Sequence, residues 1–268
     1  MSRISVVLFL IISITSCVDS YLPEIDEYEN RLVVDGLLTN GDDPIIVKLS
    51  LSSSVNSNES VPVTGGELYI TDQDQHETQL FETDPGTYKV LDSTFRGQVG
   101  SSYQLHIVLP DGRSFESDIC ELNAPSSIDS VYGLVESQEL LNYNHPIYGI
   151  QFYIDNHSDN HDTCYYLWNL TKTFEYRASF TLDYTWEGEF IPFPNPDSLR
   201  TCWLTAPVRN TFTFSTKNLD KPVIKGFPFN YVSTQTKELS IKYSLMVKQL
   251  SISEEAFIFW DAIPQHQA

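Results

Sequence analysis

The residues most able to do chemistry lie in one polar segment, residues 155–162. Imidazole nitrogens suit zinc or copper and carboxylates suit calcium, so its histidines and acids are candidate ligands for a divalent ion. Two histidines four residues apart share a face only on a helix, whereas this density of Asn and Asp favours a turn. We therefore expect a polar connection between strands, with a metal site as the alternative. The candidate metal ligands are His157, Asp159, His161 and Asp162.

The sequence has four cysteines. Cys17 follows an apolar leader and is considered below as a site of lipid attachment. Cys164 and Cys202 both fall in the second half of the chain, so we expect them to form the disulfide if one forms, which leaves Cys120 as a thiol. An exported protein reaches an oxidising compartment, where one such bond is permitted.

Enzyme signatures are missing from the sequence. It has no G-x-S-x-G elbow, no H-E-x-x-H pair, no phosphate-binding loop and no dinucleotide fingerprint. We therefore expect a non-catalytic protein without a cofactor. A hydrolase whose catalytic groups come together only in the fold is the alternative.

Aromatic residues crowd the segment from Tyr165 to Phe193. Tyr166, Trp168 and Leu170 share one strand face, and so do Leu182, Tyr184 and Trp186; such faces usually build a core, so we expect core rather than a ligand platform. The following segment contains three prolines, which exclude a central strand and predict an extended loop. Its exposed rings, Phe190 and Phe193, are a candidate contact site.

The first 16 residues have the plan of a signal peptide. Arg3 precedes an apolar run, Ile4–Ile12, which is too short to cross a bilayer. Small residues then precede Cys17, a pattern that resembles a bacterial lipobox, in which the cysteine thiol is acylated. The alternative is an ordinary secretory signal with a cysteine near its end. Residues 17–30 are acidic and without period, which predicts a tether.

The chain is strongly acidic. Its 268 residues include 36 acidic and 16 basic residues, a formal net charge of −20. Because nucleic-acid affinity depends on neutralising phosphates with Lys and Arg, we expect no nucleic-acid partner. The same charge disfavours adsorption to an anionic bilayer, so membrane attachment is expected only through lipid on Cys17.

Residues 31–124 show the pattern of short β-strands. Alternation of apolar and polar residues is clearest in Ile45–Leu51 and in Ser102–Leu109. Asp72–Gln75 predicts a hairpin turn rather than a calcium loop. Short strands at this spacing predict an immunoglobulin-like β-sandwich. The expected strands are Arg31–Leu38, Ile45–Leu51, Glu67–Thr71, Glu77–Phe81, Thr87–Leu91, Ser102–Leu109 and Ser114–Leu122.

A Pro- and Ser-containing boundary at residues 124–127 precedes longer, more aromatic strands, and residues 127–268 predict a second antiparallel β domain. The expected strands are Ser130–Val135, Tyr148–Asp155, Cys164–Tyr176, Phe180–Glu187, Asn210–Ser215 and Leu239–Leu250.

A short C-terminal helix is expected after the last strand. Ser251–Glu254 fits an N-cap box, and Phe257, Trp260 and Ile263 recur at helical spacing. This apolar stripe needs a covering partner. The chain ends soon after Ile263, which puts the completeness of the second domain in question.

Several segments in order resemble one bacterial family. Arg31–Thr39, Phe95–Gly100 with Leu109–Gly112, and Tyr243–Trp260 resemble the lipoprotein family catalogued as domain-of-unknown-function family 4249. The resemblance implies a lipid-anchored outer-membrane protein with an immunoglobulin-like N-terminal part, often associated with TonB-dependent receptors. No catalytic residue carries over, and Cys17 carries over as the lipid site. Members of the family usually continue past the terminal helix.

Together these features predict a lipid-anchored protein of the cell outer membrane. We expect a non-catalytic ligand-binding or accessory partner of a TonB-dependent receptor, with recognition on loops and exposed aromatics. The first alternative is a structural or adhesive surface protein, and the second is the envelope hydrolase described above.

Overall fold

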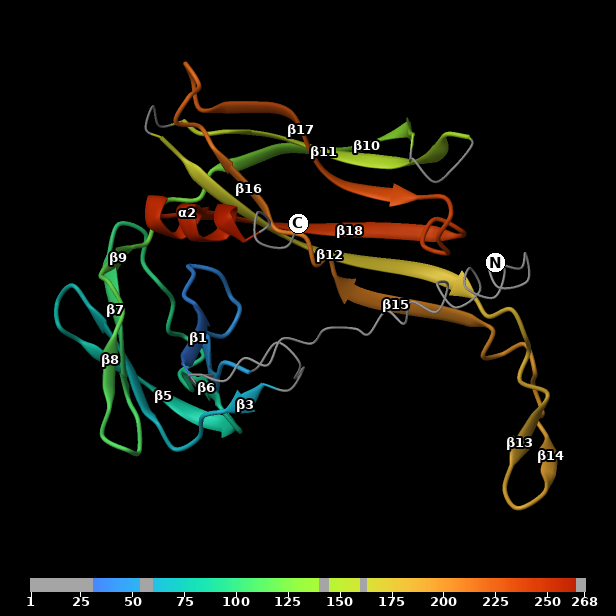
Figure 1. Ribbon diagram of the computed structural model, residues 1–268, viewed down its shortest axis with the longest axis horizontal. Helices are drawn as coiled ribbons and strands as arrows, with labels where there is room; N and C mark the ends of the chain where they lie inside the picture. The colour runs from blue at the N-terminus through green and yellow to red at the C-terminus, as the bar shows by residue number, and fades with distance from the viewer. Residues whose placement is uncertain (1–30, 54–59, 140–144, 160–162, 264–268) are drawn as a thin grey trace, which may run out of the picture.

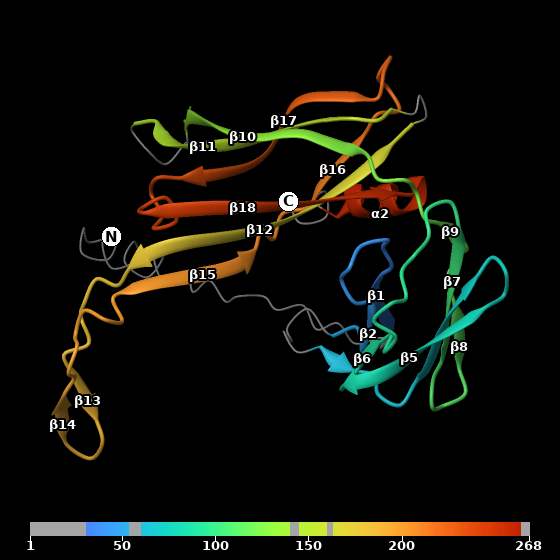
Figure 2. The same cartoon turned by 180° about the vertical axis from the view of Figure 1, so that it is seen from behind.

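The computed structural model describes residues 31–53, 60–139, 145–159 and 163–263. The leader, Cys17 and the acidic tether lie outside these residues. The described chain is antiparallel β throughout apart from one short helix, which confirms the predicted all-β class. Figures 1 and 2 show two bodies side by side, residues 32–121 and residues 127–262, and a small hairpin, residues 184–192, that projects away from both.

The first body is a sheet of nine strands. In sheet order β1 is followed by β2, β6, β5, β4, β7 and β8, with β3 on β2 and β9 on β7. The sheet turns at β5, because Glu77–Leu80 pair with β4 and Phe81–Asp84 pair with β6. The strands follow one continuous path, and the immunoglobulin-like sandwich stays a prediction. The strands are β1 (Leu32–Leu37), β2 (Ile46–Leu51), β3 (Val61–Pro62), β4 (Glu67–Asp72), β5 (Glu77–Asp84), β6 (Thr87–Lys89), β7 (Ser102–Val108), β8 (Ser114–Glu116) and β9 (Cys120–Glu121).

Alternating apolar residues of these strands meet in one core. Leu49, Leu68 and Tyr88 are almost completely buried at its centre. The Glu82 carboxylate holds two turns together, since it accepts hydrogen bonds from the backbone N–H groups of Gly65 (2.8 Å) and Gly86 (2.9 Å). These contacts fix the ends of the strands around the core.

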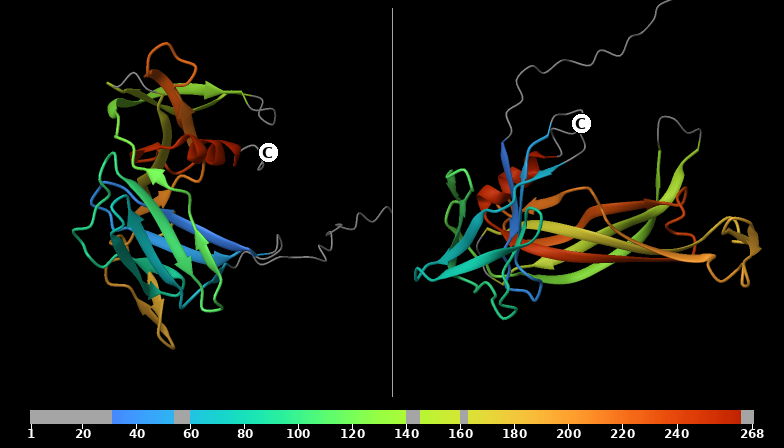
Figure 3. Two further views of the ribbon diagram at one scale, coloured as in Figure 1. Left: turned by 90° about the vertical axis from the view of Figure 1, so that its left-hand side faces the viewer. Right: turned by 90° about the horizontal axis from the view of Figure 1, so that it is seen from below.

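The second body is a curved half-barrel of two sheets. One sheet has the order β10-β11-β17; in the other, β12 pairs with β18 along one edge and with β15 and β16 along the other. Figure 3 shows these long strands lying together, with the helix at one end and the hairpin at the other. The strands are β10 (Ser127–Gln138), β11 (Ile147–His157), β12 (Tyr165–Arg177), β15 (Thr201–Pro207), β16 (Phe212–Ser215), β17 (Val223–Ser233) and β18 (Lys242–Ile252).

Two long strands were not predicted, β15 and β17. Gly226 and Pro228 interrupt the pattern of β17, and the pairing of β17 with β11 is irregular at both places. The predicted strand Phe180–Glu187 is shorter than expected, because only Tyr184–Trp186 (β13) is extended and paired. The predicted strand Ser114–Leu122 is likewise divided between β8 and β9.

The core of the second body is aromatic, as the pattern of β12 predicts. Tyr166, Trp168 and Leu170 are at most 3% exposed. A polar group crosses this core: Gln249 Oε1 accepts hydrogen bonds from Asn156 Nδ2 and Trp168 Nε1, both at 2.8 Å. Gln249 Nε2 donates to the carbonyl oxygen of Ser126 (3.0 Å), which ties the segment between the two bodies to the core.

The C-terminal helix α2 (Glu254–Ala262) confirms the predicted change of period. Its N-cap is Ser253, whose hydroxyl accepts a hydrogen bond from Ala256 N–H (3.2 Å), so the cap lies two residues after the expected Ser251. The stripe residues Phe257, Trp260 and Ile263 are each half-buried. Phe257 contacts Tyr165 of β12 at a ring distance of 5.3 Å, so the stripe faces the half-barrel.

Candidate functional site

The projecting hairpin carries a cluster of exposed aromatic rings. Strand β13 pairs with β14 (Phe190–Pro192), and the two are joined through Glu187, Gly188 and Glu189. Gly188 has a φ of +90°, a conformation that favours glycine. The Phe193 N–H donates to the carbonyl oxygen of Asp183 (2.8 Å) and extends the pairing at the base.

Three rings cluster on this hairpin. Phe190 lies 5.0 Å from Trp186 and 6.4 Å from Tyr184 between ring centroids, with interplanar angles of 68° and 82°. The exposed fractions are 74% for Phe190, 66% for Trp186 and 57% for Tyr184. We call these three residues the aromatic hairpin. The rings stabilise one another edge to face and leave most of their surface in water.

Two sequence predictions are corrected here. Phe190 was expected in an extended loop, but it begins a strand; the prolines are tolerated because this two-stranded sheet has no central strand. Leu182, Tyr184 and Trp186 were expected in the core, but all three are exposed because no second sheet covers β13. Of the two predicted contact residues, Phe190 is exposed and Phe193 is half-buried at the base.

The hairpin is also acidic. Asp183, Glu187 and Glu189 lie on it, and residues 183–192 contain no Lys or Arg. A surface of this kind combines apolar rings with carboxylates at the turn. It can insert into an apolar pocket whose rim carries positive charge.

The candidate metal ligands are only partly placed by the structure. His157 Nδ1 contacts Asp129 Oδ1 at 2.5 Å, and His157 Nε2 lies 3.6 Å from Asp159 Oδ1. Lys225 Nζ donates to the other oxygen of Asp129 (3.1 Å) and lowers the pKa of that carboxyl. His157 therefore already contacts the carboxylates of Asp129 and Asp159, and His161 and Asp162 lie outside the described residues.

A second acidic group lies in the β4–β5 turn. The ligand atoms of Asp72, Asp74 and His76 lie within 4.8 Å of one another. Asp72 Oδ1 accepts hydrogen bonds from the N–H groups of Asp74 (2.8 Å) and His76 (2.9 Å), so the cluster closes the turn. The predicted hairpin turn is confirmed, and its hydrogen bonds account for the geometry.

The predicted disulfide is wrong. None of the three described cysteines forms one. Cys202 pairs with Tyr176 near the end of β12, whereas Cys164 directly precedes the start of β12. A strand rises about 3.3 Å per residue, so the two thiols are far beyond the reach of a disulfide.

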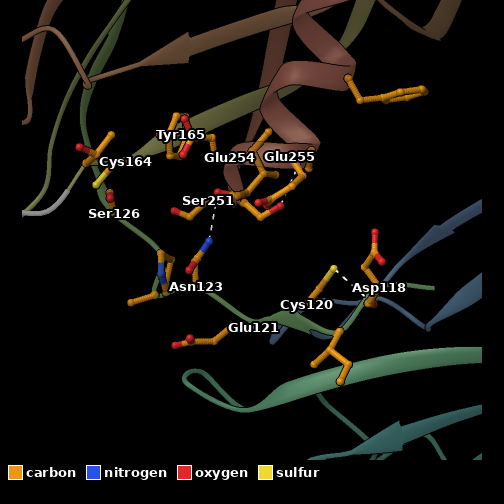
Figure 4. A pocket seen from close by; sticks show the side chains of 18 of the residues that line it. Asp118, Cys120, Glu121, Asn123, Ser126, Cys164, Tyr165, Ser251, Glu254 and Glu255 are labelled. Carbon is orange, nitrogen blue, oxygen red and sulfur yellow. Dashed lines mark hydrogen bonds between the residues drawn. The ribbon is translucent and has the colours of Figure 1, made fainter.

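A cavity with a volume of about 1460 Å³ lies between the two bodies (Figure 4). It is bordered by β9, the segment 123–127, the start of β12 and the first turn of α2. Asn123 Nδ2 crosses it to the carbonyl oxygen of Ile252 (3.0 Å). The lining carboxylates are Glu116, Asp118, Glu121, Asp159, Glu254 and Glu255.

The ionisable groups that line this cavity are mostly acidic. Lys217 Nζ donates to Glu254 (2.6 Å) and lowers the pKa of that carboxyl. Burial raises the pKa of the Cys120 thiol, and the carboxylates of Asp118 and Glu255 raise it further. Cys120 is thus a protonated thiol at neutral pH, a weak nucleophile. Sequence reasoning missed the cavity, because its walls come from separate stretches of the chain.

The described residues define a class of protein: two antiparallel β bodies that carry a projecting aromatic hairpin. Within this part of the chain, no helix is long and apolar enough to cross a membrane. The family model described as a domain of unknown function, DUF4249, matches residues 18–268, so the chain belongs to that family. No curated protein matches the chain.

Proposed function

We propose that this protein is a lipid-anchored, non-catalytic subunit of the bacterial outer membrane that binds a TonB-dependent receptor as its accessory partner. The aromatic hairpin carries the proposal. Cys17 supplies the anchor, and the hairpin supplies the main contact with the receptor.

Exposure of the three rings supports a binding role. Burying a large apolar side chain stabilises a folded protein by roughly 1.5–3 kcal/mol. Because the three rings of the aromatic hairpin are mostly exposed, the monomer lacks most of this stabilisation at each of them. Tyr and Trp are also the residues most often found at the energetic centre of interfaces. A partner that covers Phe190, Trp186 and Tyr184 would recover this energy.

The geometry favours a protein pocket over a sugar. A sugar ring stacks on a flat aromatic face, but here the rings stand at 68° and 82° to one another. Such an arrangement forms a wedge. The carboxylates of Glu187 and Glu189 at the turn oppose insertion into lipid, because a charged group is costly in hydrocarbon. The matching site is an apolar pocket rimmed by Lys or Arg.

The point variants Phe190→Ala and Trp186→Ala test this proposal. Each should weaken binding to the detergent-solubilised receptor about 30-fold, because an interface hot spot costs about 2 kcal/mol or more when truncated. Trp203→Ala on β15 is the matched control, since Trp203 is 57% exposed but lies outside the hairpin. The measurement is the dissociation constant together with the melting temperature.

An excision variant separates binding from folding. The N–H of Ala178 donates to the carbonyl oxygen of Arg200 (2.8 Å), and Arg177 pairs with Thr201, so residues 179–199 leave and re-enter a continuous β12–β15 ladder. Replacing 179–199 with a short Asn-Gly turn should keep the melting temperature and abolish binding. Receptor binding that survives the excision would refute the proposal.

A further inference from the structure

Strand β10 has a long free edge. Its 12 residues pair with β11 from Ser127↔His157 to Gln138↔Ile147, and within the described residues no strand pairs with its other side. Such an edge presents unpaired backbone N–H and C=O groups at alternate residues. β10 is the longest edge strand of the described chain.

The opposite edge of the same sheet shows how this protein protects a strand. β17 carries Lys225 and Pro228, and its ladder with β11 is irregular at two places. Proline, lysine and bulges are the usual means of preventing edge-to-edge pairing. β10 contains neither Pro nor Lys, and its one irregularity lies near its start, between Ile128 and Ser130.

Two apolar side chains of β10 lie on the core-facing side of the sheet but remain exposed to solvent. Val131 pairs with the fully buried Ile154, and Val135 pairs with Ile150, so both valines lie on the core-facing side of the sheet. Their exposed fractions are nevertheless 39% and 78%. A further strand beside β10 would bury both and continue the core of the half-barrel.

From this edge we infer that β10 is the docking site for an extended β-strand of another protein, which adds to the sheet in antiparallel or parallel register. The docked strand has apolar residues at every second position, on the same face of the sheet as Val131 and Val135. Basic residues on it complement Glu136 and Glu139 at the end of β10. This site is separate from the aromatic hairpin, and it does not depend on the function proposed above.

A second copy of this chain is a poorer occupant. Each chain has a net charge of −20, so two chains repel each other. The pairing strand of a second copy would itself contribute Glu136, which places carboxylates near carboxylates. A foreign basic strand avoids both costs.

The test uses the full-length protein in detergent and a synthetic twelve-residue peptide with Val at every second position and Thr or Lys between. Amide hydrogen exchange should slow within residues 130–138 when the peptide is added. The same peptide with an N-methylated backbone has the same side chains and charge but cannot complete the ladder, so it should have no effect.

Variants of Val135 sharpen the test. Val135→Lys should weaken peptide binding at least tenfold, because an edge lysine opposes pairing, whereas Val135→Thr should stay within about twofold of the parent. The exposure of Val135 makes both variants compatible with folding, which an unchanged melting temperature verifies. Phe190→Ala should leave peptide binding unchanged, so failure here and failure of the hairpin proposal are distinguishable.

Any one of several results would overturn the inference. The first two are unchanged amide exchange in β10 at millimolar peptide, and equal protection of β10 by the N-methylated peptide. A third is complete loss of peptide binding at about 1 M salt, where charge attraction is screened within about 3 Å. A fourth is a Val135→Lys variant that binds the peptide as tightly as the parent protein does. A concentration-dependent dimer with β10 already protected would assign the edge to a second copy instead, and would also refute the foreign strand.

Discussion

Gln249 joins three parts of the second body, so its replacement by leucine should be among the most damaging changes of one side chain in the core. Its Oε1 accepts from Asn156 and Trp168, and its Nε2 donates to the Ser126 carbonyl. Gln249→Leu keeps the volume approximately and removes all three hydrogen bonds.

The magnitude follows from the burial of the two orphaned donors. Asn156 is 0% exposed and Trp168 is 1% exposed, so neither Nδ2 nor Nε1 can turn to bulk water. A buried donor without an acceptor costs about 1–3 kcal/mol. We therefore expect Gln249→Leu to lower the free energy of unfolding by about 2–6 kcal/mol. Adding Asn156→Leu should restore part of this, because the orphaned amide is removed.

Urea unfolding followed by tryptophan fluorescence measures this effect well. All four tryptophans, Trp168, Trp186, Trp203 and Trp260, lie in the second body or its hairpin, so the signal reports the part that contains Gln249. Gln151→Leu is the control, since among the described residues Gln151 Nε2 donates to the neighbouring Phe152 carbonyl alone (3.1 Å). A Gln249→Leu midpoint equal to that of the control would refute the reasoning.

Three further outcomes are expected. Burial raises the pKa of Tyr166 and of Tyr243 to about 12. The neutral phenols therefore stabilise the fold fully below pH 10, and this contribution is lost as the pH rises towards 12. The free energy of unfolding should fall between pH 10 and pH 12, and it should fall less steeply in the double variant Tyr166→Phe, Tyr243→Phe. Gly86→Ala should lower stability by about 1–3 kcal/mol in a urea titration followed by circular dichroism, because φ is +69° and a Cβ would lie 2.6 Å from the Leu49 carbonyl oxygen; a change under 0.5 kcal/mol contradicts this. Cys17→Ala should release the protein from membrane fractions while Cys120→Ala stays bound, and an intact mass of the parent without acyl chains would exclude the anchor.

Strict alternation made the half-buried strands predictable from sequence. Ile45–Leu51 and Tyr243–Val247 each place apolar residues on one face, and in the structure those faces line the two cores. The period identifies such strands because a shift of one residue would move every apolar side chain into water. The change to helical spacing after Ser251 was visible for the same reason.

Other features depend on contacts that no local pattern records. Alternation shows that Tyr184 and Trp186 share a face, but not whether another sheet covers that face, and here none does. Cys164 directly precedes β12 and Cys202 lies on its neighbour β15, yet only the register shows that the two cysteines lie near opposite ends of β12. The free edge of β10 is likewise a property of the finished sheet.

The position of the hairpin explains how exposed rings are compatible with a stable fold. Residues 179–199 interrupt a ladder that is already closed by the Ala178–Arg200 hydrogen bond, and the aromatic core of Tyr166 and Trp168 lies at the opposite end of β12. The core therefore does not depend on the identity of the hairpin side chains. A segment with this freedom can carry Trp186 and Phe190 for contact with a partner, because folding does not require their burial.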